Sequence, residues 1–225
     1  MNKVYIKGKR FFAPILAAST LLALFISPAF ATLPVVELSL LEHSKPRTET
    51  ITHIVLHYMS NVVANPKDPY IIEEAARIFA LNGVSAHYII GRDGTIYFCV
   101  PEHRVAYHAG KGVLEDYPNY KDSLNQYSVG IEILAIGTYE EMAGYGITAE
   151  MYSKLDPAHI GFTEMQYESL NHLINDILSR HSSISSDRRH IIGHNEYAPG
   201  RKQDPGALFD WNRVSLSTNR KYNNE

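Results

Sequence analysis

"SVGIEILAIG", residues 128–137, is almost entirely apolar and contains several β-branched side chains. A short, uninterrupted apolar run of this kind predicts a strand in the middle of a sheet whose two faces are both covered. The run holds one carboxylate, Glu132, and a carboxylate is costly to bury unless it is paired or functional. The stretch therefore predicts the centre of the fold and also one candidate functional residue.

The segments on either side of this strand complete an α/β pattern. They predict a strand over 51–58, a helix over 70–82 that ends at Gly83, a hairpin over 85–100 around Asp93-Gly94, an amphipathic helix from 162 to 181 and a short strand in "RHIIGH", 189–194. For the long helix, we expect Thr163 as N-cap and a buried stripe of Met165, Leu170, Leu173, Ile174, Ile177 and Leu178. The order β-α-β-β-β-α-β predicts an α/β (α+β) protein with a single mixed central β-sheet flanked by helices. Residues 138–161 fit no clean period and are interpreted as an insertion near the functional site.

The first 31 residues are typical of a secretory signal peptide. Four basic residues precede an apolar run, and the small-residue pattern of Ala29 and Ala31 predicts cleavage after Ala31. The alternative is an uncleaved membrane anchor, because the apolar run is about as long as the shortest membrane spans. The small-residue site favours cleavage, so we expect an exported protein, periplasmic or extracellular, without a stable membrane anchor.

The remaining chain, residues 32–225, has the size of a single domain, with a core over about 51–211. Removal of four positive charges changes the net charge of the whole chain, −3, to −7. This balance argues against a nucleic-acid partner, which would require a basic face. Cys99 is the only cysteine, so no internal disulfide can form. Nothing in the sequence requires a second subunit, and we expect a monomer.

A loop near the end of the chain, "IIGHNEYAPGRKQDPG", residues 191–206, combines prolines and glycines with His194, Lys202 and Asp204. His57 ends the first predicted strand as His194 ends the last one, and active sites of α/β sheets gather at such strand ends. Two imidazoles and one carboxylate form a ligand set of catalytic zinc, which leaves a fourth position open. A solvated turn is the alternative interpretation, and the spacing alone does not decide between the two.

Glu132 and Lys202 favour the catalytic interpretation. A carboxylate inside an apolar strand is expected to have a raised pKa, as suits a general base and acid, although an ion pair with a buried Arg or Lys is an alternative. Lys202 lies two residues before Asp204 and could stabilise an oxyanion, although a solvated loop lysine would have the same local sequence.

Four motifs in a fixed order make the chain resemble a known family. "SAHYIIGRDGTI", "AYHAG", "NQYSVGIEI" and "GHNEYAPGRKQDPG" resemble the zinc-dependent N-acetylmuramoyl-L-alanine amidases of the type-2 amidase family, which is related to peptidoglycan recognition proteins. The resemblance extends from about residue 51 to 211 and implies a fold like that of peptidoglycan recognition proteins. Phage members of the family carry a tyrosine where this chain has Ala86 and a cysteine where it has Asp204.

The resemblance implies one Zn²⁺ per chain and hydrolysis of the amide between N-acetylmuramic acid and L-alanine of the peptidoglycan stem, in cell-wall turnover or lysis. It assigns zinc binding to His57, His194 and Asp204, and catalysis to Glu132 and Lys202. It further implies contacts to peptidoglycan or muropeptides from His108, Asn125 and Arg201. A recognition module without activity, or a zinc peptidase that cuts within the stem, would be competing functions on the same substrate.

Overall fold

The computed structural model describes residues 35–217. The predicted signal peptide lies outside these residues, as do residues 218–225. A search of the described helices for one long and apolar enough to cross a membrane finds none.

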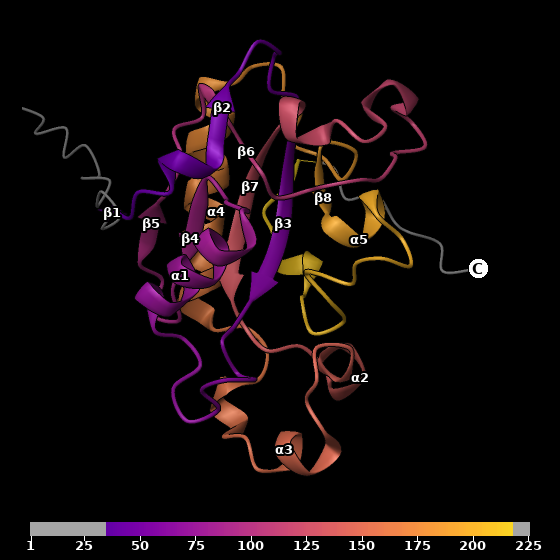
Figure 1. The fold of residues 1–225 in the computed structure, drawn as a ribbon. Helices are drawn as coiled ribbons and strands as arrows, with labels where there is room; N and C mark the ends of the chain where they lie inside the picture. Colours follow the sequence, from indigo (N-terminus) through magenta and orange to yellow (C-terminus); the bar gives the residue numbers. More distant parts are fainter. Residues whose placement is uncertain (1–34, 218–225) are drawn as a thin grey trace, which may run out of the picture. The chain divides into compact units, whose positions relative to one another are not determined.

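A mixed sheet forms the centre of the described chain (Figure 1). Its strand order is β1-β5-β4-β7-β3-β8, and all neighbours are parallel except the antiparallel pair β4–β5. The strands are β1 (Val35–Glu37), β3 (His53–Met59), β4 (Tyr88–Ile90), β5 (Ile96–Phe98), β7 (Ser128–Leu134) and β8 (Ile191–Gly193). As predicted from its apolar run, β7 is an inner strand and all of its residues are buried.

Two helices cover opposite faces of this sheet, α1 (Ile72–Asn82) and α4 (Glu164–Arg180) (Figure 1). Side chains alternate between the faces of a strand, so Ile131 and Ile133 of β7 contact the core under α4, whereas Leu134 belongs to the core under α1. Two predicted helix ends are confirmed. Thr163 is the N-cap of α4, and Gly83 ends α1 at a φ of 62°. The predicted α/β fold, with one mixed central sheet flanked by helices, is confirmed.

The prediction that Met165 belongs to the buried stripe of α4 is wrong. Met165 is 53% exposed, and Tyr167 is buried in its place. The stripe that contains Leu170 and Leu173 runs back through Tyr167, three residues before Leu170. Met165 is five residues before Leu170, which turns it about 140° around the helix, away from the sheet.

Short elements that have no clear sequence period complete the fold. They are a two-stranded antiparallel sheet of β2 (Ser44–Pro46) and β6 (Arg104–Ala106), the helices α2 (Tyr139–Ala143), α3 (Ala149–Ser153) and α5 (His194–Tyr197), and the 3-10 helices η1 (Leu41–His43), η2 (Pro118–Tyr120), η3 (Leu124–Tyr127), η4 (Pro157–His159) and η5 (Trp211–Arg213). The unassigned stretch 138–161 thus consists mainly of α2, α3 and η4.

Candidate active site

Sheet register places two predicted site residues side by side. His57 on β3 pairs directly with Glu132 on β7, and both strands are parallel. The alternation that directs Ile131 toward α4 directs both of these side chains to the other face. His57 is 1% exposed and Glu132 is 9% exposed, so the two polar groups lie in a largely dry environment. Burial, together with the nearby His194, lowers the pKa of His57 to about 4, so its ring is neutral at pH 7.

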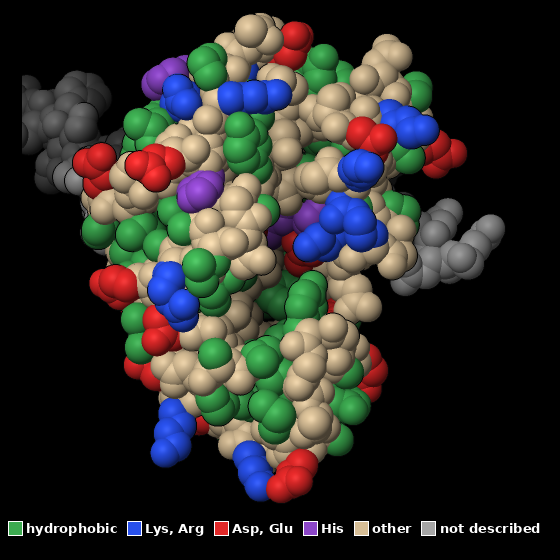
Figure 2. Space-filling model, viewed as in Figure 1, with side chains coloured by type: hydrophobic (Ala, Val, Ile, Leu, Met, Phe, Trp, Pro, Cys, Tyr) green, Lys and Arg blue, Asp and Glu red, His purple; other side chains and the backbone are tan. Residues whose placement is uncertain are grey.

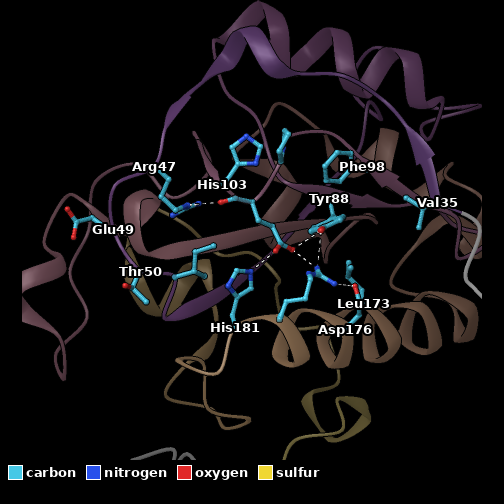
Figure 3. A pocket seen from close by; sticks show the side chains of 14 residues that line it. Val35, Arg47, Glu49, Thr50, Tyr88, Phe98, His103, Leu173, Asp176 and His181 are labelled. Carbon is cyan, nitrogen blue, oxygen red and sulfur yellow. Dashed lines mark hydrogen bonds and ion pairs between the residues drawn. The ribbon is translucent and has the colours of Figure 1, made fainter.

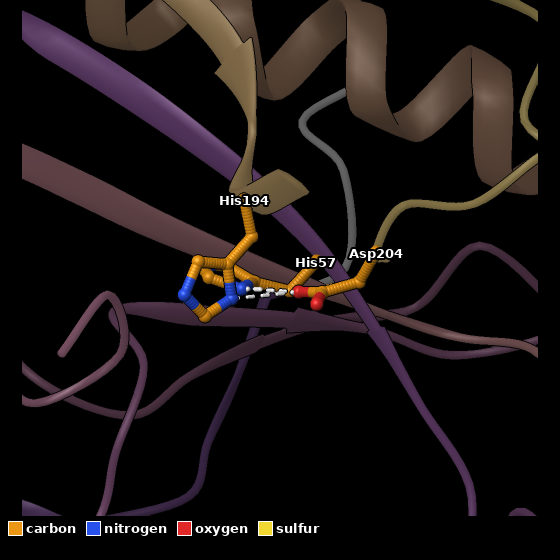
Figure 4. A group of neighbouring side chains, drawn as sticks. All are labelled: His57, His194 and Asp204. Atoms are coloured by element: carbon orange, nitrogen blue, oxygen red, sulfur yellow. Dashed lines mark hydrogen bonds and ion pairs between the residues drawn. The ribbon is translucent and has the colours of Figure 1, made fainter. Parts of the chain in front are cut away.

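The other two predicted metal ligands come from the end of β8 and from the loop that follows α5. His194 is the first residue after β8, and Asp204 lies in the loop between α5 and η5. One carboxylate oxygen of Asp204, Oδ2, is 2.7 Å from His57 Nδ1 and 2.9 Å from His194 Nδ1 (Figure 4). The ligand atoms of these three buried residues lie within 4.8 Å of one another. The structure therefore brings together the His-His-Asp set that the sequence proposed.

Asp204 carries the negative charge of this cluster. Burial alone would raise the pKa of its carboxyl, but the His194 and His57 imidazoles beside it hold that pKa well below its usual range. A buried, ionised carboxylate beside two imidazoles is a donor set that matches a divalent zinc ion in number and in atom type.

Glu132 has no comparable set of partners. Its Oε2 atom is buried without a hydrogen bond, so the alternative prediction of an ion pair is not what the described residues show. Burial, and next the negative charge of Asp204, raise the pKa of Glu132 to about 8, against the opposing charge of Lys202. A carboxyl group with a pKa near neutrality can both accept and return a proton, which is the property of a general base and acid.

A remote glutamate holds the loop that carries Asp204. The Glu141 side chain on α2 accepts hydrogen bonds from the backbone N–H of Ala207 at 2.6 Å and of Thr138 at 2.8 Å. Gly206 has a φ of +83°, and a Cβ atom there would come within 2.9 Å of both Glu141 oxygens. Sequence reasoning missed Glu141, although the spacing T-x-x-E of a capping box was visible at Thr138.

A cavity of about 670 Å³ opens onto this cluster. Figure 2 shows it as a hollow, with histidine and basic side chains above and mostly hydrophobic side chains below. Lys202 lines it together with the three clustered ligands and Glu132, and Met142 and Tyr145 contribute from the 138–161 stretch. The volume lies within the usual range of small-molecule sites.

The predicted substrate contacts are placed differently from one another. His108 lines the cavity, but its ring also contacts His57, with 3.0 Å between Nδ1 and His57 Nε2. Asn125 and Arg201 bind the backbone beside it: Asn125 Oδ1 accepts from the N–H groups of His108 and Ala109, and Arg201 donates to the Ala109 carbonyl. Neither Asn125 nor Arg201 is among the residues that line this cavity. Their contact to substrate stays a prediction.

Another cavity, of about 710 Å³, lies beside Ile51, two residues before β3 begins (Figure 3). Its central acid, Glu102, accepts hydrogen bonds from Tyr88 at 2.7 Å, from Arg180 at 2.7 Å and from the His181 ring at 2.6 Å. Because these charges satisfy one another, the cavity offers no reactive group comparable to Glu132. Size alone therefore does not identify the functional site.

Comparison with known proteins identifies the chemistry that this arrangement serves. Residues 47–207 match the family described as N-acetylmuramoyl-L-alanine amidase. The chain belongs to this family. It is 30% identical over 185 residues to the 1,6-anhydro-N-acetylmuramyl-L-alanine amidase AmpD of Haemophilus influenzae, covering 77% of this chain and 85% of AmpD. The family predicted from the four motifs is confirmed, and the protein is an amidase.

Solved structures agree with this assignment. A selenomethionine derivative of AmpD matches with a TM-score of 0.56 and 27% identity, over 82% of this chain and 93% of that one. AmiD from E. coli, in complex with anhydro-N-acetylmuramic acid-L-Ala-D-γ-Glu-L-Lys, matches with a TM-score of 0.53 and 26% identity, over 73% of this chain and 56% of AmiD. The amidase fold therefore accounts for most of the described residues.

Proposed function

We propose that this protein uses a zinc ion to hydrolyse the amide bond between N-acetylmuramic acid and L-alanine of peptidoglycan stem peptides. The observation that carries the proposal is the convergence of His57, His194 and Asp204 beside the unpartnered Oε2 of Glu132. The family match supports the same reaction, as does the muramyl-peptide substrate bound to AmiD.

His57 and His194 would hold the zinc ion through Nδ1, and Asp204 would hold it through a carboxylate oxygen. The three groups supply the nitrogen and oxygen ligands of catalytic zinc sites and leave the cavity side free for substrate. A bound zinc ion supplies Lewis acidity, which makes water a stronger acid and a carbonyl carbon more electrophilic.

Glu132 moves the protons of the reaction. Its carboxylate takes a proton from the water whose oxygen attacks the carbonyl carbon of the lactyl group. It then returns that proton to the alanine nitrogen as the carbon–nitrogen bond breaks, so that a carboxylic acid and a free amine leave. The raised pKa of Glu132, about 8, suits both halves of this task.

Lys202 stabilises charge rather than moving protons. It lines the same cavity and acts electrostatically on both Glu132 and His57. The carbonyl oxygen of the substrate becomes negative when water attacks, and an ammonium group placed at that oxygen lowers the energy of the transition state. Such a contribution is typically worth about 3 kcal/mol.

The N-terminal sequence leads us to propose further that the protein is exported, which would bring it to peptidoglycan outside the cytoplasmic membrane. Cell fractionation with mass analysis of the recovered protein tests this. We expect a chain that begins at Thr32 outside the cytoplasm. Recovery of the full-length chain in the cytoplasmic fraction would contradict export but would leave the amidase activity untouched.

Mass spectrometry of the reaction products tests the amidase activity. Incubation of the zinc-loaded protein with an anhydro-muramyl tripeptide should release a tripeptide with L-alanine at its free amine and a muramic acid with a free lactyl carboxylate. A peptidase would instead leave L-alanine attached to the sugar, and a recognition module would leave the substrate intact. As the control, Glu132→Gln should retain its zinc and turn over about 10²- to 10⁴-fold more slowly; a near wild-type rate would exclude Glu132 as the proton carrier.

A further inference from the structure

The His108 ring lies flat against β7, between His57 and Ser128. Its Nδ1 is 3.0 Å from His57 Nε2, and its Nε2 is 3.2 Å from Ser128 Oγ. Gly130 makes this position possible, because a Cβ atom on Gly130 would lie 2.4 Å from the ring. Glycine inside a strand often marks such a close approach. The His108 ring is therefore packed against β7, directly beside the predicted metal ligand His57.

His57, His108, Ser128 and the Leu124 carbonyl form a series of hydrogen bonds. The position of each proton in this series follows from its last member, the carbonyl. Ser128 Oγ is 2.7 Å from the carbonyl oxygen of Leu124, which can only accept, so the hydroxyl proton is used there. Ser128 must then accept a hydrogen bond from His108 Nε2–H. A neutral imidazole carries one proton, so a ring that donates its Nε2–H to Ser128 keeps a lone pair on Nδ1, toward His57.

The same reasoning extends to both predicted histidine ligands. His108 Nδ1 can only accept, so His57 donates its Nε2–H to it and keeps a lone pair on Nδ1. His194 donates its Nε2–H to the carbonyl of Ala109 at 2.8 Å, which leaves its Nδ1 lone pair free in the same way. Both lone pairs face the carboxylate of Asp204, and three acceptors without a proton between them require a cation.

We propose that His108 and Ala109 are positioning residues that set the tautomer and the orientation of both zinc-binding histidines. His108 acts on His57 through its ring, and Ala109 acts on His194 through its carbonyl. This inference rests on the zinc site of the proposed function and adds residues that were predicted only as substrate contacts or not at all. Outer-shell partners of metal-binding histidines commonly change metal affinity by about 10- to 100-fold.

Asn125 and Arg201 hold this two-residue segment in place. Asn125 Oδ1 accepts from the backbone N–H groups of His108, at 3.1 Å, and of Ala109, at 2.8 Å. Arg201 donates to the Ala109 carbonyl at 2.8 Å, the same oxygen that receives the proton of His194. The exposed Arg201 and the partly buried Asn125 thus converge on the backbone behind the metal ligands.

Zinc affinity, measured by competition with a chromophoric chelator, tests the proposal without reference to turnover. His108→Phe fills the same space but cannot accept a proton from His57, and its Kd for zinc should rise about 10- to 100-fold. His108→Asn places an amide oxygen near the position of Nδ1 and should recover most of that affinity. His53→Phe is the matched control, because His53 is fully buried on β3, packs against Tyr117 and Tyr120, and does not contact His57.

The outcomes separate this inference from the proposed function. If the wild-type protein binds no zinc, the proposed metal site itself is wrong. If the wild type binds zinc and His108→Phe binds it within twofold of that affinity, the positioning role is wrong and the zinc site stands. If His108→Asn is as weak as His108→Phe, a hydrogen-bond acceptor at this position does not restore zinc affinity, which also overturns the role.

Discussion

The two halves of the candidate site are held by different kinds of structure. His57 and Glu132, the strand half, are neighbours in the register of β3 and β7, and backbone hydrogen bonds of the sheet determine their spacing. Lys202 and Asp204, the loop half, lie in a segment that the sheet does not hold. That segment depends on a few hydrogen bonds. Among them are those from Asn195 N–H to the Asp204 carbonyl, at 2.9 Å, and from Ala207 N–H to the Glu141 side chain.

This difference shows where precision in the site comes from. The strand half is rigid because moving either residue would break sheet hydrogen bonds that the whole core shares. The loop half gains its position from α2, a helix about sixty residues earlier in the chain, and from the two histidines that contact Asp204. A bound metal ion would join the two halves, because His57 of the strand half and Asp204 of the loop half would both coordinate it.

Removal of one ligand from each half should give the largest effect. His57→Ala and Asp204→Ala should each weaken zinc binding by more than the roughly 100-fold typical of an outer-shell partner, because a directly bound group is lost. Metal analysis after dialysis should find the wild type loaded and both variants nearly empty. His172→Ala, an exposed histidine on α4, is the control. Retention of zinc by either variant would mean that its half of the site does not bind metal.

Glu132 should destabilise the zinc-free fold at alkaline pH. Burial raises its pKa from 4.5 to about 8, so the folded protein holds this proton more tightly than the unfolded chain does. The resulting stabilisation is present below pH 4.5 and is lost as the pH rises to about 8, where the buried carboxyl must ionise. The strand half thus pairs a rigid position with an energetic cost.

Glu132→Gln removes this cost and should make the zinc-free protein more stable at pH 8.5, by about 4–5 kcal/mol, with little change at pH 5. Urea unfolding in the presence of a chelator at both pH values measures the difference. Glu168→Gln, at an exposed position on α4, should show no such pH dependence. Equal stability of Glu132→Gln and wild type at pH 8.5 would show that the Glu132 carboxyl is not strained by its burial.

The sequence predicted the strand half better than the loop half, for a physical reason. An apolar run, one acid within it and one histidine at the end of a β-branched segment are local patterns, and strands turn such patterns into positions. The motif around Asp204 identified its loop, but the partners that hold it are set by folding of distant segments. Glu141 is 66 residues from Ala207, and His108 is 51 residues from His57. No local sequence pattern predicts these contacts, although a glycine inside a strand, Gly130, indicated that another group packs closely there, which is the His108 ring.

The smallest of the expected effects distinguishes the halves most directly. Glu141→Gln replaces one carboxylate oxygen by an amide NH₂ that must face a backbone N–H, of either Ala207 or Thr138, and one hydrogen bond is lost. The cost should be about 1–3 kcal/mol, borne mostly by the loop. Hydrogen exchange should become faster in residues 198–207 while β3 and β7 keep their protection, and zinc affinity should fall several-fold. Glu140→Gln, the same substitution at the adjacent exposed position, is the control. Unchanged exchange in the loop, or equal loosening of the two strands, would show that α2 does not hold the loop half separately from the sheet.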